Sequence, residues 1–209
     1  MTAQVLERPA QSLRDDFEEA IAHRMVIARQ AVEAARAADP LTGLTLAETT
    51  AWAARRAEGH CAEAEGFAAE VSDLLSSGKM NDAVRALDGS AEAAAQAAAR
   101  DALAASDAAV AIRDRASEAE AAVHQARDLV ALAARSHQGR DVEWLVRAAA
   151  RVTTLAEAAR RVRWGAQAAG EIALGANATS IQASVALEVA RTNLEVAGLR
   201  AGALAAAGA

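Results

Sequence analysis

Apolar residues recur at alternating intervals of three and four along most of this chain, which is the spacing of one face of an α-helix. The clearest run contains Ala109, Ile112, Ala116, Ala119, Val123, Ala126, Val130 and Ala133. We call this run the alanine seam, and its next step falls on His137. A pattern that repeats every seven residues over many turns predicts long helices packed as a coiled coil.

The same spacing, interrupted by turn residues, predicts helices over residues 12–38, 46–76, 80–136 and 142–205. Ser12, Thr45 and Asp141 are the expected N-caps. A break is expected near residues 88–90, where Asp88-Gly89 stops one helix and Ser90 caps the next, and a bend near 163–175. Residues 1–11 are expected to be a flexible N-terminus and 206–209 a frayed tail.

Composition explains how such helices would pack. About three residues in ten are alanine, tyrosine is absent, and the chain has only two Phe and three Trp. Alanine is the best helix former, and its small side chain allows helix axes to approach toward the lower end of the usual 8–10 Å. The sequence therefore predicts an all-α fold, an elongated antiparallel alanine-rich helical bundle or coiled coil.

Charge and residue usage exclude several classes of function. The net charge of −6 argues against a nucleic-acid partner. No stretch of twenty residues is apolar enough to cross a bilayer, and the N-terminus has no secretory signal pattern. A single cysteine excludes an intrachain disulfide. We expect a cytoplasmic protein with no membrane partner.

Histidine and glutamate pairs are the candidate metal ligands. Glu19 and His23 are four residues apart, as are Glu120 and His124, and His60 precedes Glu63 by three. Such pairs could hold a metal or small ligand inside a bundle. They are equally the spacing of ordinary surface pairs on a helix, so no metal or cofactor is predicted.

No catalytic motif is present, and the chain is not predicted to be an enzyme. His60 and Cys61 are adjacent, which could suggest a nucleophile or a ligand. Neighbours on a helix point about 100° apart, however. A buried histidine that sets the helix register, beside a small buried cysteine, is the simpler interpretation. His137 is interpreted as a C-terminal helix residue that interacts with the last carbonyls.

Arginine and tryptophan cluster at the start of the last helix. A patch that could dock an acidic partner contains Arg147, Arg151, Arg160, Arg161 and Arg163. A solvated helix face is the alternative, since Glu143 and Glu157 precede two of these arginines by four residues. Trp144 and Trp164, at the two sides of this patch, are expected as core anchors or interface residues.

The segment 165–187 has Glu171 as its only charged residue. A helix without a charged face is covered on most sides, either within the chain or between subunits. Interface candidates are therefore Trp144, Trp164, Gly165, Gly170, Gly175, Gly198 and Gly202. The sequence favours a structural or scaffold protein that forms a homo-oligomer or binds a helical partner; the alternative is a metal- or small-ligand-binding helical bundle.

Overall fold

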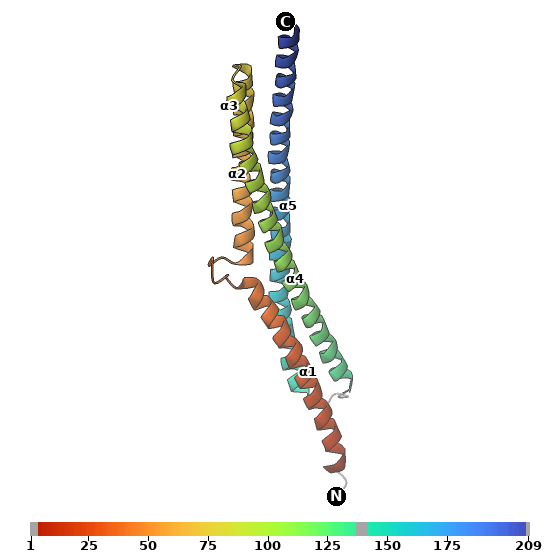
Figure 1. Ribbon diagram of the computed structural model, residues 1–209. Coiled ribbons are helices and arrows are strands. Elements are labelled where there is room, and N and C mark those ends of the chain that lie inside the picture. The colour runs from red at the N-terminus through yellow and green to blue at the C-terminus, as the bar shows by residue number, and fades with distance from the viewer. Residues whose placement is uncertain (1–3, 137–141, 208–209) are drawn as a thin grey trace. The chain divides into compact units, whose positions relative to one another are not determined.

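The alanine-rich chain forms long helices, as its intrinsic propensity dictates. The computed structural model describes residues 4–136 and 142–207, and these residues contain helices and short connections with no β-strand (Figure 1). The all-α prediction is thereby confirmed. The elements are α1 (Gln4–Arg36), α2 (Leu46–Ser76), α3 (Met80–Arg85), the π-helical turn η1 (Ala86–Ala91), α4 (Glu92–Ser136) and α5 (Val142–Ala207).

The start of the first helix differs from the sequence-based expectation. Helix α1 begins at Gln4 rather than after Ser12, so Ser12 lies inside it. Pro9 lies just beyond the first turn of α1 and has no N–H to donate to the Val5 carbonyl, so the helix lacks one backbone hydrogen bond near its N-terminal end. His137 and the proposed N-cap Asp141 lie outside the described residues.

The Asp88-Gly89 pair does not end a helix. It lies inside η1, which joins α3 to α4 with helical backbone at both of its ends, so Ser90 is not an N-cap. A wider turn absorbs the local disruption that was expected to stop the helix. Helix α5 likewise runs through Gly165, Gly170 and Gly175 as one helical segment.

Glycine is required at the two turns where the backbone is left-handed. Gly43 has φ of 70° between α1 and α2, and Gly78 has φ of 71° after α2. At the second turn the Lys79 N–H donates to the Leu74 carbonyl at 2.9 Å, and the Gly78 N–H donates to that of Leu75 at 3.1 Å. This pair of hydrogen bonds is the Schellman ending of a helix, and α2 ends just before it at Ser76.

The chain divides into two compact units. Unit 1 comprises Met1–Ala47 and Val110–Ala168, and unit 2 comprises Glu48–Ala109 and Ala169–Ala209. Helices α4 and α5 are therefore both divided, with one segment in unit 1 and the other in unit 2. The division of α5 falls at residues 168 and 169, inside the glycine-containing segment that was expected to bend.

Unit 1 is built from α1, the later part of α4 and the earlier part of α5. Buried residues come from all three segments, among them Ile21 and Val32 of α1, Ile112 and Val123 of α4, and Val152 of α5. Seven of the eight residues of the alanine seam are buried, and Val130 is half-buried. Each buried methyl group contributes about 0.8 kcal/mol, so a seam of this kind stabilises through its length.

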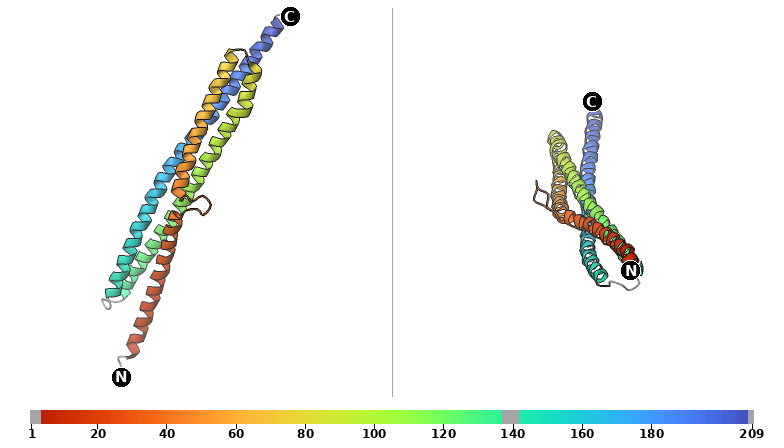
Figure 2. Two further views of the ribbon diagram at one scale, coloured as in Figure 1. Left: turned by 90° about the vertical axis from the view of Figure 1, so that its left-hand side faces the viewer. Right: turned by 90° about the horizontal axis from the view of Figure 1, so that it is seen from below.

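Unit 2 packs α2 against the first part of α4 and the last part of α5 (Figures 1 and 2). One cluster joins Cys61 and Ala64 of α2 to Ala94, Ala98 and Ala183. A second cluster contains the larger residues Val71 and Leu87 together with Ala83, Ala91 and Ala190. The small side chain of alanine on all the facing helices permits close approach of their backbones.

Candidate functional site

A row of exposed apolar side chains runs along the part of α5 that belongs to unit 2. We call it the α5 outer stripe. Apart from Thr192 its members are apolar, and it contains Leu174, Ala178, Ile181, Val185, Val189, Thr192, Val196 and Leu199. Leu174 is 70% exposed and Leu199 75%, while Ile181, Val185 and Val189 are 63%, 56% and 54% exposed. Single exposed apolar residues are ordinary on a protein surface, but an aligned row of them marks a contact surface.

The outer stripe lies opposite the buried face of the same helix. At 100° per residue, Ala176, Ala183 and Ala190 lie about half a turn away from it, and all three are buried. Helix α5 is therefore apolar on two faces, and the other helices of unit 2 cover only one of them. Because two opposite faces of the helix are apolar, residues 165–187 have no charged face.

The position of α5 within unit 2 is fixed by an ion pair as well as by alanine packing. Arg191 Nη2 lies 3.4 Å from Glu92 Oε1 on α4, and Arg191 Nη1 lies 4.0 Å from Glu188 Oε2. Both contacts lie to one side of the outer stripe, and the contact to Glu92 links α5 to α4.

The candidate interface glycines do not provide close approach within the chain. A Cβ atom added at Gly165, Gly170, Gly175, Gly198 or Gly202 would meet no neighbouring atom within 4 Å. Trp164 is 66% exposed. Trp144, by contrast, is buried in unit 1, where the Arg14 guanidinium lies 5.8 Å from its ring centre.

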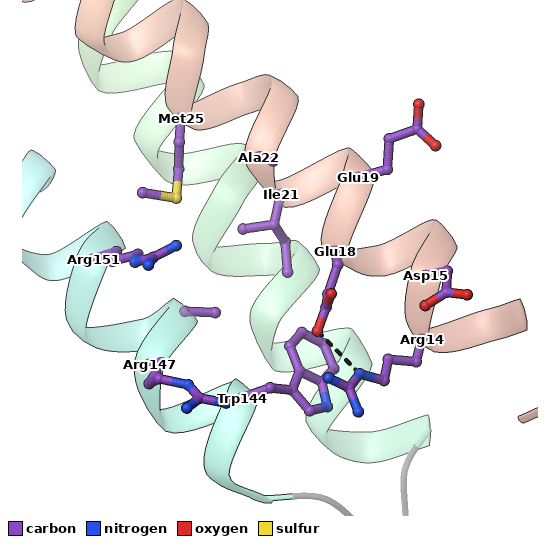
Figure 3. Close-up of a pocket in the computed structure, with 11 residues that line it drawn as sticks. Arg14, Asp15, Glu18, Glu19, Ile21, Ala22, Met25, Trp144, Arg147 and Arg151 are labelled. Carbon is purple, nitrogen blue, oxygen red and sulfur yellow. Dashed lines mark hydrogen bonds and ion pairs between the residues drawn. The ribbon is translucent and has the colours of Figure 1, made fainter. Parts of the chain in front are cut away.

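A second surface feature is a groove between α1 and α5 in unit 1, shown in Figure 3. Its volume is about 600 Å³, and it continues past Met25 and Arg151 into a further groove of about 640 Å³. Arginines line the two grooves from both helices, and the carboxylates of Asp15, Glu18 and Glu19 line the first groove from α1. The larger apolar residues and the arginines of the two grooves are Ile21, Met25, Trp144, Leu155, Arg14, Arg29, Arg147 and Arg151.

The arginines of this groove differ in how they are paired. Arg14 Nε donates to Glu18 at 3.0 Å, drawn as a dashed line in Figure 3, and Arg147 Nη1 donates to Glu143 at 3.0 Å. Among the described residues, no ion pair is found for Arg29 or Arg151. Two guanidinium groups from opposite walls are thus available to an anionic group beside Met25.

The predicted arginine patch is divided between two faces of α5. Arg147 and Arg151 line the groove facing α1. Arg160 and Arg163 lie instead along the side facing α4, where Arg163 Nη1 donates to Glu120 Oε2 at 2.6 Å. Arg161 is exposed and lines neither surface. Sequence spacing on one helix could not reveal this division, because it depends on where α1 and α4 pack.

The candidate metal ligands are not gathered into one site. Glu19 lies in the α1–α5 groove, whereas Glu120 and His124 lie between α4 and α5 beside Arg160. His23 is exposed on α1. Within residues 4–136 and 142–207, no three His, Cys, Asp or Glu side chains are placed so that they could hold one metal ion.

His60 lies in a charged cluster of unit 2 that sequence spacing did not reveal. Its Nδ1 lies 3.0 Å from Glu63 Oε2, and its Nε2 lies 3.5 Å from Asp101 Oδ2 on α4. Arg56 Nε lies 3.2 Å from the same Asp101 oxygen. The two ring nitrogens of His60 thus lie near carboxylates of two different helices, α2 and α4.

Cys61 is buried beside this cluster with its side chain directed into the alanine packing. Burial raises the pKa of the Cys61 thiol and the Glu65 carboxylate raises it further, whereas a backbone hydrogen bond at Ala183 lowers it. A thiol with a raised pKa is a poor nucleophile at neutral pH. The arrangement is that of a structural cysteine.

Comparison of the chain with protein-family models, with curated proteins and with solved structures found no match. None of the helices in the described part of the chain combines the length and hydropathy needed to cross a membrane. The function must therefore be argued from the surfaces themselves.

Proposed function

We propose that this chain is a non-enzymatic structural or scaffold protein that associates with itself or with a helical partner through the α5 outer stripe. The observation that carries the proposal is the row of exposed apolar side chains from Leu174 to Leu199, opposite the buried face of the same helix. At 1.5 Å per residue this row is about 38 Å long, which suits a helix–helix interface.

The size of the effect is compatible with reversible association. Six large apolar side chains on each copy are about half exposed, and burying the exposed half contributes roughly 1 kcal/mol per side chain. Two copies together would gain roughly 12 kcal/mol, against an association cost of about 4–15 kcal/mol. We therefore expect self-association at micromolar concentrations rather than an obligate complex.

The buried alanines support a mode of assembly based on rigid helices. We infer that the helices pack as a long, antiparallel, alanine-rich coiled coil, in which close approach replaces bulky core residues. Such packing leaves no deep cavity for a substrate, and the grooves of the described residues are open and shallow. A scaffold that presents a long helix edge is the function that this packing serves best.

The test is the molar mass in solution over a range of micromolar concentrations, by light scattering combined with small-angle X-ray scattering. The wild-type protein should show a mass above that of one chain, increasing with concentration. Replacing Ile181 and Val185 together by Asp should return the mass to that of one chain, with unchanged helical circular dichroism. Leu103→Asp, at an exposed apolar position of α4 away from the stripe, is the matched control. A wild-type protein that remains monomeric contradicts the proposal.

A second candidate function is recognition of an acidic amphipathic helix by the α1–α5 groove of unit 1. The supporting observation is the pair Arg29 and Arg151 beside the apolar residues Met25 and Leu155. In a background with Trp52 and Trp164 replaced by Phe, Trp144 fluorescence can report binding of a synthetic Glu- and Leu-rich helical peptide. Arg29→Gln with Arg151→Gln should weaken binding at least tenfold, and Arg161→Gln should not. Equal peptide binding by the Trp144-only background, by the Arg29→Gln and Arg151→Gln double variant and by Arg161→Gln would exclude this function.

A further inference from the structure

We propose that the partner on the α5 outer stripe is a second copy of the same stripe, antiparallel to the first, with a two-fold axis between Val185 and Val189. This inference rests on the proposed function, because it specifies the partner of that surface. It concerns only the segment of α5 in unit 2, from Glu171 to Arg200. Its basis is the symmetry of the stripe in both spacing and charge.

The spacing of the stripe reads almost the same in both directions. An antiparallel arrangement places Val185 opposite Val189 of the second copy, and Ile181 opposite Thr192. It also places Ala178 opposite Val196, and Leu174 opposite Leu199. The midpoints of the four pairs lie within half a residue of one another, at or just before residue 187, so a single two-fold axis satisfies all four pairs. An interface of this kind, with the same surface on both subunits, is the commonest way in which proteins form dimers.

The charges at the ends of the stripe distinguish antiparallel from parallel pairing. Glu171 lies at the N-terminal end and Arg200 at the C-terminal end, on the same edge of the stripe, and both are exposed. Antiparallel pairing brings Glu171 of each copy to the level of Arg200 of the other, which gives two favourable contacts. In a parallel two-fold pair the same edge of the two copies lies on opposite sides of the interface, and Glu171 of one copy is far along the helix from Arg200 of the other, so this favourable contact is absent.

The opposite edge of the stripe is also compatible with antiparallel pairing. Glu188 and Glu195 lie on that edge. With the axis given above, they face Ser184 and Asn177 of the second copy, which can donate hydrogen bonds to a carboxylate. Glu188 lies about one residue from the axis, so the two copies of Glu188 are near each other, a like-charge contact set against two Glu171–Arg200 contacts of opposite charge. An unrelated helix could cover the apolar row, but the charges at the two ends of the stripe are complementary to the stripe itself.

The experiment is disulfide cross-linking in a Cys61→Ala background, with Leu174→Cys and Leu199→Cys as separate single variants. Both positions are strongly exposed, so neither substitution should disturb folding. In the antiparallel pair, residue 174 lies about 38 Å from residue 174 of the second copy but close to its residue 199. Mild oxidation of the two variants mixed together should therefore give the mixed dimer, whereas each variant alone should give little dimer.

Efficient cross-linking of each variant with itself would overturn the inference in favour of parallel pairing. A dimeric mass by light scattering, with no cross-link in the mixture or in either single variant, would overturn it in favour of another surface. A monomeric mass for the unmodified protein would instead contradict the proposed function, and the inference with it.

A charge exchange provides a second test that needs no cysteine. Glu171→Arg alone should weaken dimerisation severalfold, and Glu171→Arg combined with Arg200→Glu should restore it. In a parallel pair residues 171 and 200 of the two copies lie far apart along the helices, so the second substitution would not restore dimerisation. Sedimentation at low salt is the measurement, because salt screens contacts of this kind.

Discussion

The carboxylate of Asp101 on α4 lies 3.2 Å from the guanidinium Nε of Arg56 on α2. Asp101 is only 9% exposed, and His60 reaches the same oxygen from the other side. The Arg56 guanidinium in turn lies 4.6 Å from the ring centre of Trp52. A charged residue thus interrupts the alanine packing of unit 2 at one place, where it fixes the register of α2 against α4.

Asp101→Asn should destabilise the protein by about 1–3 kcal/mol, because a buried polar group then loses its charged partners. Arg56 is half exposed and can recover hydration, so the loss should be smaller than for a fully buried pair. Denaturant unfolding followed by circular dichroism is the measurement. Asp107→Asn, at an exposed position of the same helix, should stay within about 0.5 kcal/mol of the wild type. Equal stability of both variants would show that the pair does not fix the register.

Alanine acts as a spacing device in unit 2, and this can be tested on a single helix. Ala183 is fully buried against α2 and α4, whereas Ala178 lies on the exposed outer stripe. Ala183→Leu should cost about 1–3 kcal/mol, because the added methylenes force the helices apart. Ala178→Leu should leave the free energy of unfolding within about 0.5 kcal/mol of the wild type. If the two variants had equal stability, the close approach of the helices would not depend on alanine.

Much of the fold could be predicted because it depends on local and periodic signals. Periodic apolar spacing located the helices, and Gly78 marked the end of α2. The start of α1 and the turn at Asp88-Gly89 were not predicted. Both depend on whether the surrounding structure tolerates a weak helix position, and sequence propensity alone does not decide that.

The candidate sites were harder to predict because they depend on which helices meet. The partners of His60 and Arg163, namely Asp101 and Glu120, are 41 and 43 residues away in the sequence. The uncharged segment 165–187 did indicate an unusual surface. Its outer stripe continues to Leu199, past Glu188 and Arg191, because those charges lie to one side of the apolar row. Only a second periodicity, traced on the opposite side of α5 from the first, could have revealed it.

The glycines of α5 have space for a side chain, whereas a glycine with left-handed backbone does not tolerate one. The two kinds of glycine should therefore respond differently to replacement by alanine. Gly175 is inside α5, and a Cβ atom added there meets nothing within 4 Å. Gly175→Ala should therefore stabilise the protein by about 0.5–1 kcal/mol through helix propensity. Gly78→Ala should destabilise it by about 1–2 kcal/mol, because φ at Gly78 is 71°. Thermal unfolding of the two variants separates these effects, and a loss of stability in Gly175→Ala would mean that α5 needs flexibility at that position.

The raised pKa of the Cys61 thiol links the packing of unit 2 to pH. Because burial disfavours the thiolate, its contribution to stability is complete below the pKa of the unfolded thiol and is lost as pH rises through the folded pKa. Alkylation of native Cys61 should accordingly be slow, with a rate that increases at higher pH than for an exposed cysteine. Leu103→Cys in a Cys61→Ala background, exposed on α4, is the comparison. Denaturant should bring the two rates together. If native Cys61 were instead alkylated fast, with the same pH dependence as the exposed thiol, α2 would have to open readily from α4 and α5. Alanine packing alone would then not hold unit 2 closed.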